Sequence, residues 1–114
     1  MIEDKIFDFA GVMDRLDNDR DLLKEIVQIF FEGLEESLGA IKRAADKKDG
    51  PAYGAAAHSI KGALGNIGAM RAYRKAYELE TKGKNSVMDN ALGLLDELQK
   101  EISAFKSEYE KSQI

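Results

Sequence analysis

Apolar residues recur every three or four positions along most of the chain, a spacing that predicts helices. The longest apolar stripe predicts a helix over about residues 20 to 48, about 40 Å long at 1.5 Å per residue. Its members are Leu23, Val27, Phe30, Leu34, Leu38, Ile41 and Ala45. No segment alternates with period two over the length of a strand, so the pattern predicts an all-α chain.

A short helix is predicted before the long one, over about residues 9 to 16. Asp8 is a plausible N-cap for this short helix, and Asp19 can cap the long helix that follows it. A second stripe adjoins the start of the long helix, formed by Leu22, Ile26 and Ile29. We expect the short helix to cover this stripe.

A third helix is predicted over about residues 51 to 65. Gly50 can end the long helix, and Pro51 fits the first turn of the next one. The core stripe of this helix consists of Tyr53, Ala57, Ile60 and Leu64, and it continues to Ile67. Gly68 then allows a tight turn.

Two further helices complete the predicted fold. The fourth, over about residues 69 to 82, has a mostly small inner stripe of Ala69, Ala72, Ala76 and Leu79. Residues 82–85 are predicted as a linker, and Ser86 with Asp89 resembles a capping box. The last helix carries Met88, Leu92, Leu95, Leu98, Ile102, Phe105 and Tyr109, and it should fray from about Glu110. Four long helices with short connections predict an antiparallel up-down-up-down bundle, with the short N-terminal helix across one end.

The only histidine, His58, lies on the face of the third helix opposite the core stripe, together with Lys61. Gly54, Gly62 and Gly65 share this face, and each glycine costs a helix about 1 kcal/mol relative to alanine. Helical side chains lean toward the helix N-terminus, so we expect Gly54 and Gly62 to leave both flanks of the imidazole open. A surface kept free of bulk around a histidine suggests function.

The chemistry that fits this arrangement best is phosphoryl transfer. A neutral imidazole is a competent nucleophile, and Lys61 can reach an anion attached to it. Other histidine chemistries fit less well: Ser59 points about 100° around the helix, which disfavours a hydrolytic triad. A lone histidine without cysteine cannot build a zinc site, and Ala55 stands where a di-iron Glu-x-x-His pair needs glutamate. The glycines follow a helix and not a strand, so no nucleotide loop is predicted.

Composition narrows the possible partners. The chain has 114 residues, no cysteine and a net charge of −4, consistent with one domain without disulfides. Its basic residues are scattered, which argues against nucleic acid. No apolar stretch is long enough to cross a membrane, and the N-terminus lacks a secretory pattern, so we expect a cytoplasmic protein without a cofactor or metal site of its own.

The sequence resembles the histidine phosphotransfer domain of two-component phosphorelays. The matching segments are Ala57-His58-Ser59-Ile60-Lys61-Gly62, Gly65-Asn66-Ile67-Gly68-Ala69, Ala76 and Leu79-Glu80, with Phe7-Asp8 and Phe30 as further family positions. The resemblance covers about residues 6 to 110 of a single domain spanning 1–114. Ala72 departs from the family pattern, where leucine is common.

The resemblance implies a phosphocarrier and not an enzyme. His58 would accept a phosphoryl group on its outer ring nitrogen from the aspartyl phosphate of a receiver domain and pass it to another receiver. Lys61 would stabilise the phosphoryl charge, Gly62 would keep the approach open, and Glu80 could accept an imidazole N–H. Magnesium would come with the receiver, and the partners would be response-regulator receivers or a hybrid sensor kinase.

Two alternatives remain at this point. The chain could be the phosphoacceptor domain of a chemotaxis-type kinase, or a helical adaptor that never carries phosphate. The resemblance implies that receivers dock around the histidine, which makes Phe9, Val12 and Met13 candidate docking residues; the alternative is that each of them only caps the bundle.

Overall fold

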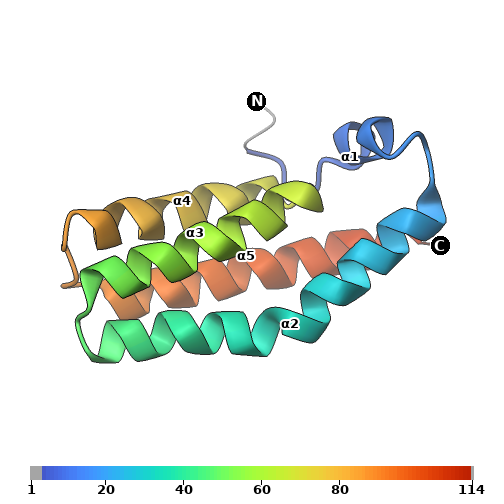
Figure 1. The fold of residues 1–114 in the computed structure, drawn as a ribbon. Helices are drawn as coiled ribbons and strands as arrows, with labels where there is room; N and C mark the ends of the chain where they lie inside the picture. The colour runs from blue at the N-terminus through green and yellow to red at the C-terminus, as the bar shows by residue number, and fades with distance from the viewer. Residues whose placement is uncertain (1–3, 114) are drawn as a thin grey trace.

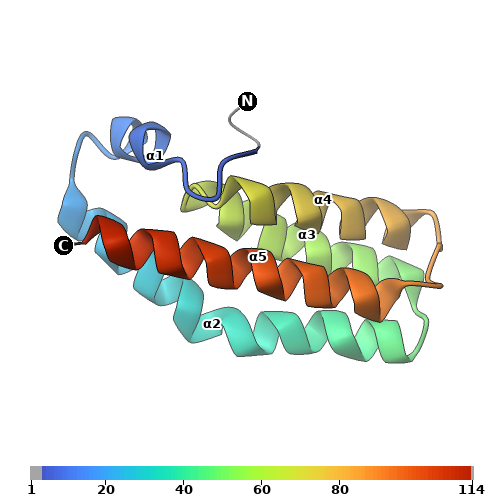
Figure 2. The ribbon, with the colours of Figure 1, turned by 180° about the vertical axis from the view of Figure 1, so that it is seen from behind.

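The computed structural model describes residues 4–113, in which every long element is an α-helix. The helices are α1 (Phe9–Arg15), α2 (Arg20–Asp46), α3 (Gly50–Asn66), α4 (Met70–Lys84) and α5 (Ala91–Ser112). The predicted all-α class is confirmed. Figures 1 and 2 show α2 to α5 side by side, each running opposite to the helix before it, with α1 at the end where α3 meets α4. None of the described helices has the length and apolar character needed to span a membrane.

Aspartate caps fix the starts of the first three helices. The side chains of Asp8 and Asp19 accept hydrogen bonds from backbone N–H groups three residues later, at 3.2 and 3.0 Å. Both predicted caps are therefore confirmed. Asp49 caps α3 in the same way at 3.1 Å, with Pro51 in the first turn where its missing N–H costs nothing.

The ends of α2 and α4 and the start of α5 differ from the predictions. Gly50 does not end α2: the left-handed residue after that helix is Lys48 (φ 54°), and Gly50 is the first residue of α3. Helix α4 continues through Lys84 into the predicted linker. The predicted capping box at Ser86 is wrong, because Ser86 adopts a left-handed turn (φ 54°) and α5 begins only at Ala91.

The core lies between α2, α3, α4 and α5, and most predicted core positions are buried. Fully buried members include Tyr53, Ile60, Leu64, Ile67, Ala76, Leu79, Leu98, Ile102 and Phe105. The Tyr53 hydroxyl donates a 2.8 Å hydrogen bond to the Ala91 carbonyl, which satisfies the one polar atom of this side chain. Three predicted stripe residues are exposed instead: Leu92 points away from the core, and α1 does not cover Leu22 or Ile29.

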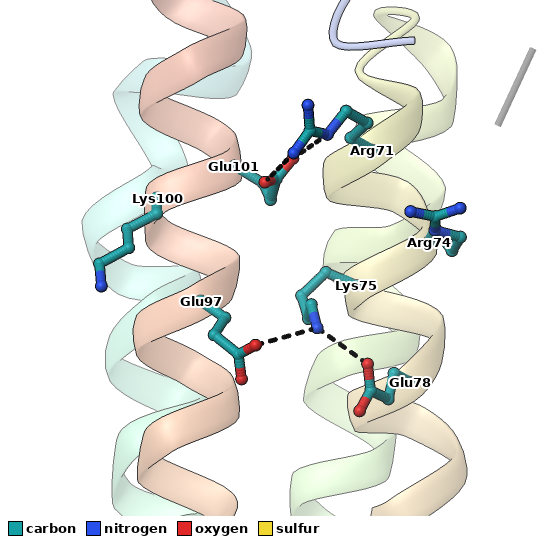
Figure 3. Close-up of a pocket in the computed structure, with 7 residues that line it drawn as sticks. All are labelled: Arg71, Arg74, Lys75, Glu78, Glu97, Lys100 and Glu101. Atoms are coloured by element: carbon teal, nitrogen blue, oxygen red, sulfur yellow. Dashed lines mark hydrogen bonds and ion pairs between the residues drawn. The ribbon is translucent and has the colours of Figure 1, made fainter. Parts of the chain in front are cut away.

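Ion pairs join α4 to α5 along the side of the bundle drawn in Figure 3. The guanidinium Nε of Arg71 lies 2.8 Å from Glu101 Oε2, and the Lys75 ammonium lies 3.3 Å from Glu97. Lys75 also pairs with Glu78 on its own helix at 2.9 Å. These basic and acidic groups compensate one another, so the hollow between them is best explained as an interhelical contact.

Candidate functional site

Helices α3 and α4 approach each other unusually closely beside His58. A Cβ atom at Gly83 would lie 2.7 Å from the Cα of Gly54 and 2.7 Å from the carbonyl oxygen of Gly50, too close for any side chain. Gly54 is therefore buried in a helix–helix contact, and it also lines, together with His58, an open hollow beside the imidazole, in agreement with the predicted open flank. Its lack of a side chain lets the backbone of α4 approach α3 closely.

The imidazole of His58 is open to solvent. Its side chain is 67% exposed on the outer face of α3. A Cβ at Gly62 would have no described atom within 4 Å outside its own helix, so Gly62 leaves open space one turn beyond the ring. Gly65 differs, because a Cβ there would lie 3.3 Å from the ring of Tyr73. Of the two glycines predicted to free the flanks of His58, Gly62 borders empty space and Gly54 lines the hollow beside the ring.

One buried carboxylate connects the charged residues of this face. Glu80 projects from α4 with only 6% of its side chain exposed. Its Oε2 atom lies 2.8 Å from His58 Nδ1 and 3.2 Å from the ammonium of Lys84. Its Oε1 atom accepts a 2.6 Å hydrogen bond from the ammonium of Lys61. The structure thus brings His58, Lys61 and Glu80 together and adds Lys84 to them.

The charge of Glu80 determines which imidazole nitrogen carries the proton. The hydrogen bond from Lys61 lowers the pKa of Glu80 to about 2, assisted by His58 and Lys84, although burial acts in the opposite direction. Glu80 is therefore an ionised carboxylate near neutral pH and can only accept hydrogen bonds. At 2.8 Å, Nδ1 of His58 must be the donor, so in the neutral ring the lone pair is on Nε2.

Lys61 lies on the inner side of the site, between Glu80 and two tyrosine rings. Its side chain is 15% exposed, and its ammonium lies 4.9 Å from the ring centre of Tyr77 and 6.0 Å from that of Tyr73. The hydrogen bond to Glu80 is the largest cause of a raised pKa, so Lys61 remains charged. The strongest interaction of this ammonium in the structure is with the carboxylate.

Lys84 is not among the residues predicted from the sequence. It falls in the segment predicted as a linker, whereas α4 continues through it. The available signal was its spacing of four residues from Glu80, which places both side chains on one face of a helix. The spacing is informative only once the helix is known to extend that far.

The predicted docking residues lie in a different environment from the one expected. Val12 and Met13 are buried, and Phe9 is partly buried, so the first two cannot contact a partner. An open groove of about 390 Å³ lies beside them, lined by Arg15, Leu16, Ile26, Ile29, Phe30, Ala63, Asn66 and Ile67. It reaches α3 at Ala63, five residues after His58. Three of its apolar lining residues, Ile26, Ile29 and Phe30, belong to α2.

Two comparisons with known proteins relate this chain to a family. A comparison with curated protein sequences gave no match. The crystal structure of histidine-containing phosphotransfer protein B (HptB) from Pseudomonas aeruginosa PAO1 superposes with a TM-score of 0.85 and 21% sequence identity, covering 96% of this chain and 95% of that one. A profile of the Hpt domain matches residues 25–108, which include α3, α4 and most of α2 and α5. The chain therefore belongs to the Hpt domain family, the histidine phosphotransfer proteins that act as phosphocarriers with receiver domains and kinases in phosphorelays.

Proposed function

We propose that His58 carries the phosphoryl group, which its Nε2 atom accepts from the aspartyl phosphate of a receiver domain and passes to the aspartate of another receiver. The observation that carries the proposal is the hydrogen bond between His58 Nδ1 and the ionised Glu80. This bond leaves the Nε2 lone pair on the outer side of an exposed ring. An oriented and accessible nitrogen is what nucleophilic attack on phosphorus requires.

The transfer step balances without an additional acid or base. The lone pair of Nε2 forms the N–P bond while the bond between phosphorus and the aspartyl oxygen breaks, and the receiver carboxylate leaves with that electron pair. The ring retains its Nδ1 proton and becomes positively charged. Glu80, 2.8 Å away, stabilises this charge, so the carboxylate interacts more strongly with the phosphorylated ring than with the neutral one.

Lys61 and Gly62 help the phosphoryl group to approach His58. Lys61 neutralises the Glu80 carboxylate at 2.6 Å, which removes a negative charge that would repel the phosphoryl oxygens. Gly62 leaves space beside the ring for the receiver's active site. We assign Mg²⁺ to the receiver, and no part of the step described above needs a metal ion on this chain.

The same proposal assigns a role to the helix arrangement and to a docking surface. The up-down-up-down arrangement of α2 to α5 holds α3 and α4 as neighbours and presents one outer face of α3. A receiver would dock on this face and extend over the groove that begins at Ala63 and includes Ile29. A partner seated there would cover the exposed apolar surface of this groove.

The experiment is phosphotransfer from a phosphorylated receiver to the purified protein. We expect an acid-labile, alkali-stable adduct on the wild type, as a phosphorus–nitrogen bond requires, and none on His58→Gln. The variant should keep its helical circular dichroism because the side chain is exposed. Phosphotransfer that survives in a folded His58→Gln protein would overturn the proposal. Incubation with a kinase catalytic domain in place of the receiver tests whether a chemotaxis-type kinase phosphorylates His58 directly.

A further inference from the structure

Lys84 differs from the other ammonium group on Glu80 in being free to move. Its side chain is 70% exposed and its ammonium is 3.2 Å from Oε2, whereas Lys61 is 15% exposed and 2.6 Å from Oε1. An exposed lysine four residues from its partner on a helix keeps its freedom to move, and the buried Glu80 retains the Lys61 ammonium when Lys84 leaves. Lys84 can therefore leave the carboxylate at little cost, while the largely buried Lys61 cannot.

Lys84 also stands beside the space next to the imidazole. It lines an open hollow of about 550 Å³ whose other members are Pro51, Gly54, Ala55, His58 and Glu80. Gly54 and Ala55 precede His58 by about one helical turn, and a helical side chain leans in that direction. A group attached to the ring therefore lies beside this hollow, with Lys84 at its edge.

The charges of the site are unbalanced in a way that suits an incoming phosphoryl group. Two ammonium groups, those of Lys61 and Lys84, contact the single carboxylate of Glu80 among the described residues. With a neutral ring, the site has one uncompensated positive charge. A dianionic phosphoryl group on a positively charged ring adds one net negative charge, so phosphorylation makes the site neutral.

We propose that Lys84 is a phosphate-binding residue of this site: its ammonium leaves Glu80 Oε2 and contacts the phosphoryl oxygens once His58 is phosphorylated. The inference rests on the proposed function of His58. It separates the roles of the two lysines, since Lys61 neutralises Glu80 in both states and Lys84 follows the phosphoryl group. Lys84 thereby stabilises the phosphorylated protein relative to the free one.

The test avoids any contribution from receiver docking. A small phosphoramidate donor phosphorylates the wild type, Lys84→Gln and Lys84→Arg without a receiver; its P–N bond breaks, ammonia leaves, and the N–P bond to Nε2 forms. Phosphorus NMR then follows the protonation of the phosphoryl group with pH. Loss of a cation within about 4 Å should lower the acid dissociation constant of the phosphoryl group roughly fivefold in Lys84→Gln, because the dianion loses its partner. Lys84→Arg should retain the wild-type value.

The matched control is Lys100→Gln, which removes an equally exposed lysine from α5 on the side of the bundle drawn in Figure 3. Its titration should follow the wild type. If Lys84→Gln titrates like Lys100→Gln, the proposal is overturned, even where Lys84→Gln slows transfer from a receiver, because that result assigns Lys84 to docking. Failure of the proposed function is a separate outcome, in which the adduct also forms on His58→Gln.

Discussion

The stability of the protein should depend on pH through Glu80, and the substitution that exposes this dependence is Glu80→Gln. Glutamine retains the shape of the side chain and removes its negative charge. In the wild type, the carboxylate accepts from three groups while only 6% of its side chain is exposed. Glutamine offers one acceptor oxygen and no charge, so its amide N–H₂ faces either Lys61, which has no acceptor, or His58 Nδ1, which can accept only if the ring proton moves to Nε2.

The magnitude follows from the pKa of the carboxyl group. A fall from 4.5 to about 2 on folding corresponds to about 3 kcal/mol of stabilisation. Because the folded pKa is lowered, this stabilisation is fully present above about pH 4.5 and is lost as the pH falls through 2. At pH 3, about 2 kcal/mol of it should already be gone. The raised pKa of Lys61 reports the same hydrogen bond and is not added to this value.

The assay is urea unfolding followed by circular dichroism at pH 7, 5, 4 and 3 for the wild type and the variant. We expect the difference in unfolding free energy between them to be largest at pH 7 and to narrow by about 2 kcal/mol at pH 3. Glu78→Gln is the matched control, because Glu78 is an exposed glutamate on the same helix whose pair with Lys75 contributes about 0 to 1 kcal/mol.

A difference between wild type and Glu80→Gln that stays constant from pH 7 to pH 3 would refute the reasoning. It would mean that the variant loses packing or hydrogen-bond geometry and not charge. A decrease with falling pH that is equally large in Glu78→Gln would show that acid acts on the whole bundle and not on this carboxylate.

The remaining predictions concern access, packing, charge and docking. Gly62→Leu should slow phosphotransfer without lowering the melting temperature. Gly83→Ala should lose about 1 to 3 kcal/mol of unfolding free energy in urea, because its Cβ meets the backbone of α3. Equal stability of the two variants would contradict the packing argument. Lys61→Ala should slow phosphotransfer by less than loss of the phosphoacceptor does, and wild-type rates would deny the lysine its role. Ile29→Asp should weaken receiver binding measured by calorimetry, unlike Leu92→Asp, which changes a residue of similar exposure (59% and 51%) on α5.

The hydrophobic pattern predicted those parts of the fold that depend on local chemistry. Asp8 and Asp19 cap their helices because a short acceptor side chain can reach the free N–H groups of the first turn in any surroundings. Tyr53, Ile60 and Leu64 share one face of α3 because 3.6 residues make a turn. Neither inference needs knowledge of the neighbouring helix, which is why both agree with the structure.

The errors lie where a neighbouring helix decides the outcome. The contact of Gly54 with Gly83 joins residues 29 positions apart, and no local pattern relates them. Glycine followed by lysine and asparagine is typical of a helix end, so the predicted α4 ends at residue 82. The close approach of α3 makes a glycine favourable inside α4, and the helix continues through Lys84. Lys84 is therefore absent from the predicted site for a reason of packing and not of chemistry.

The same contact explains how a carboxylate can serve a phosphate-accepting site. A bare carboxylate 2.8 Å from the imidazole orients the ring but repels the phosphoryl group that the ring has to accept. Because Gly54 and Gly83 bring the two helices together, Glu80 lies deep enough for Lys61 to bind its second oxygen at 2.6 Å. Orientation and charge are thereby separated: the hydrogen bond to Nδ1 remains, while the negative charge is compensated before the phosphoryl group arrives. A substitution that widens the distance between α3 and α4 should therefore impair phosphotransfer by His58, even though none of the residues of the site is itself substituted.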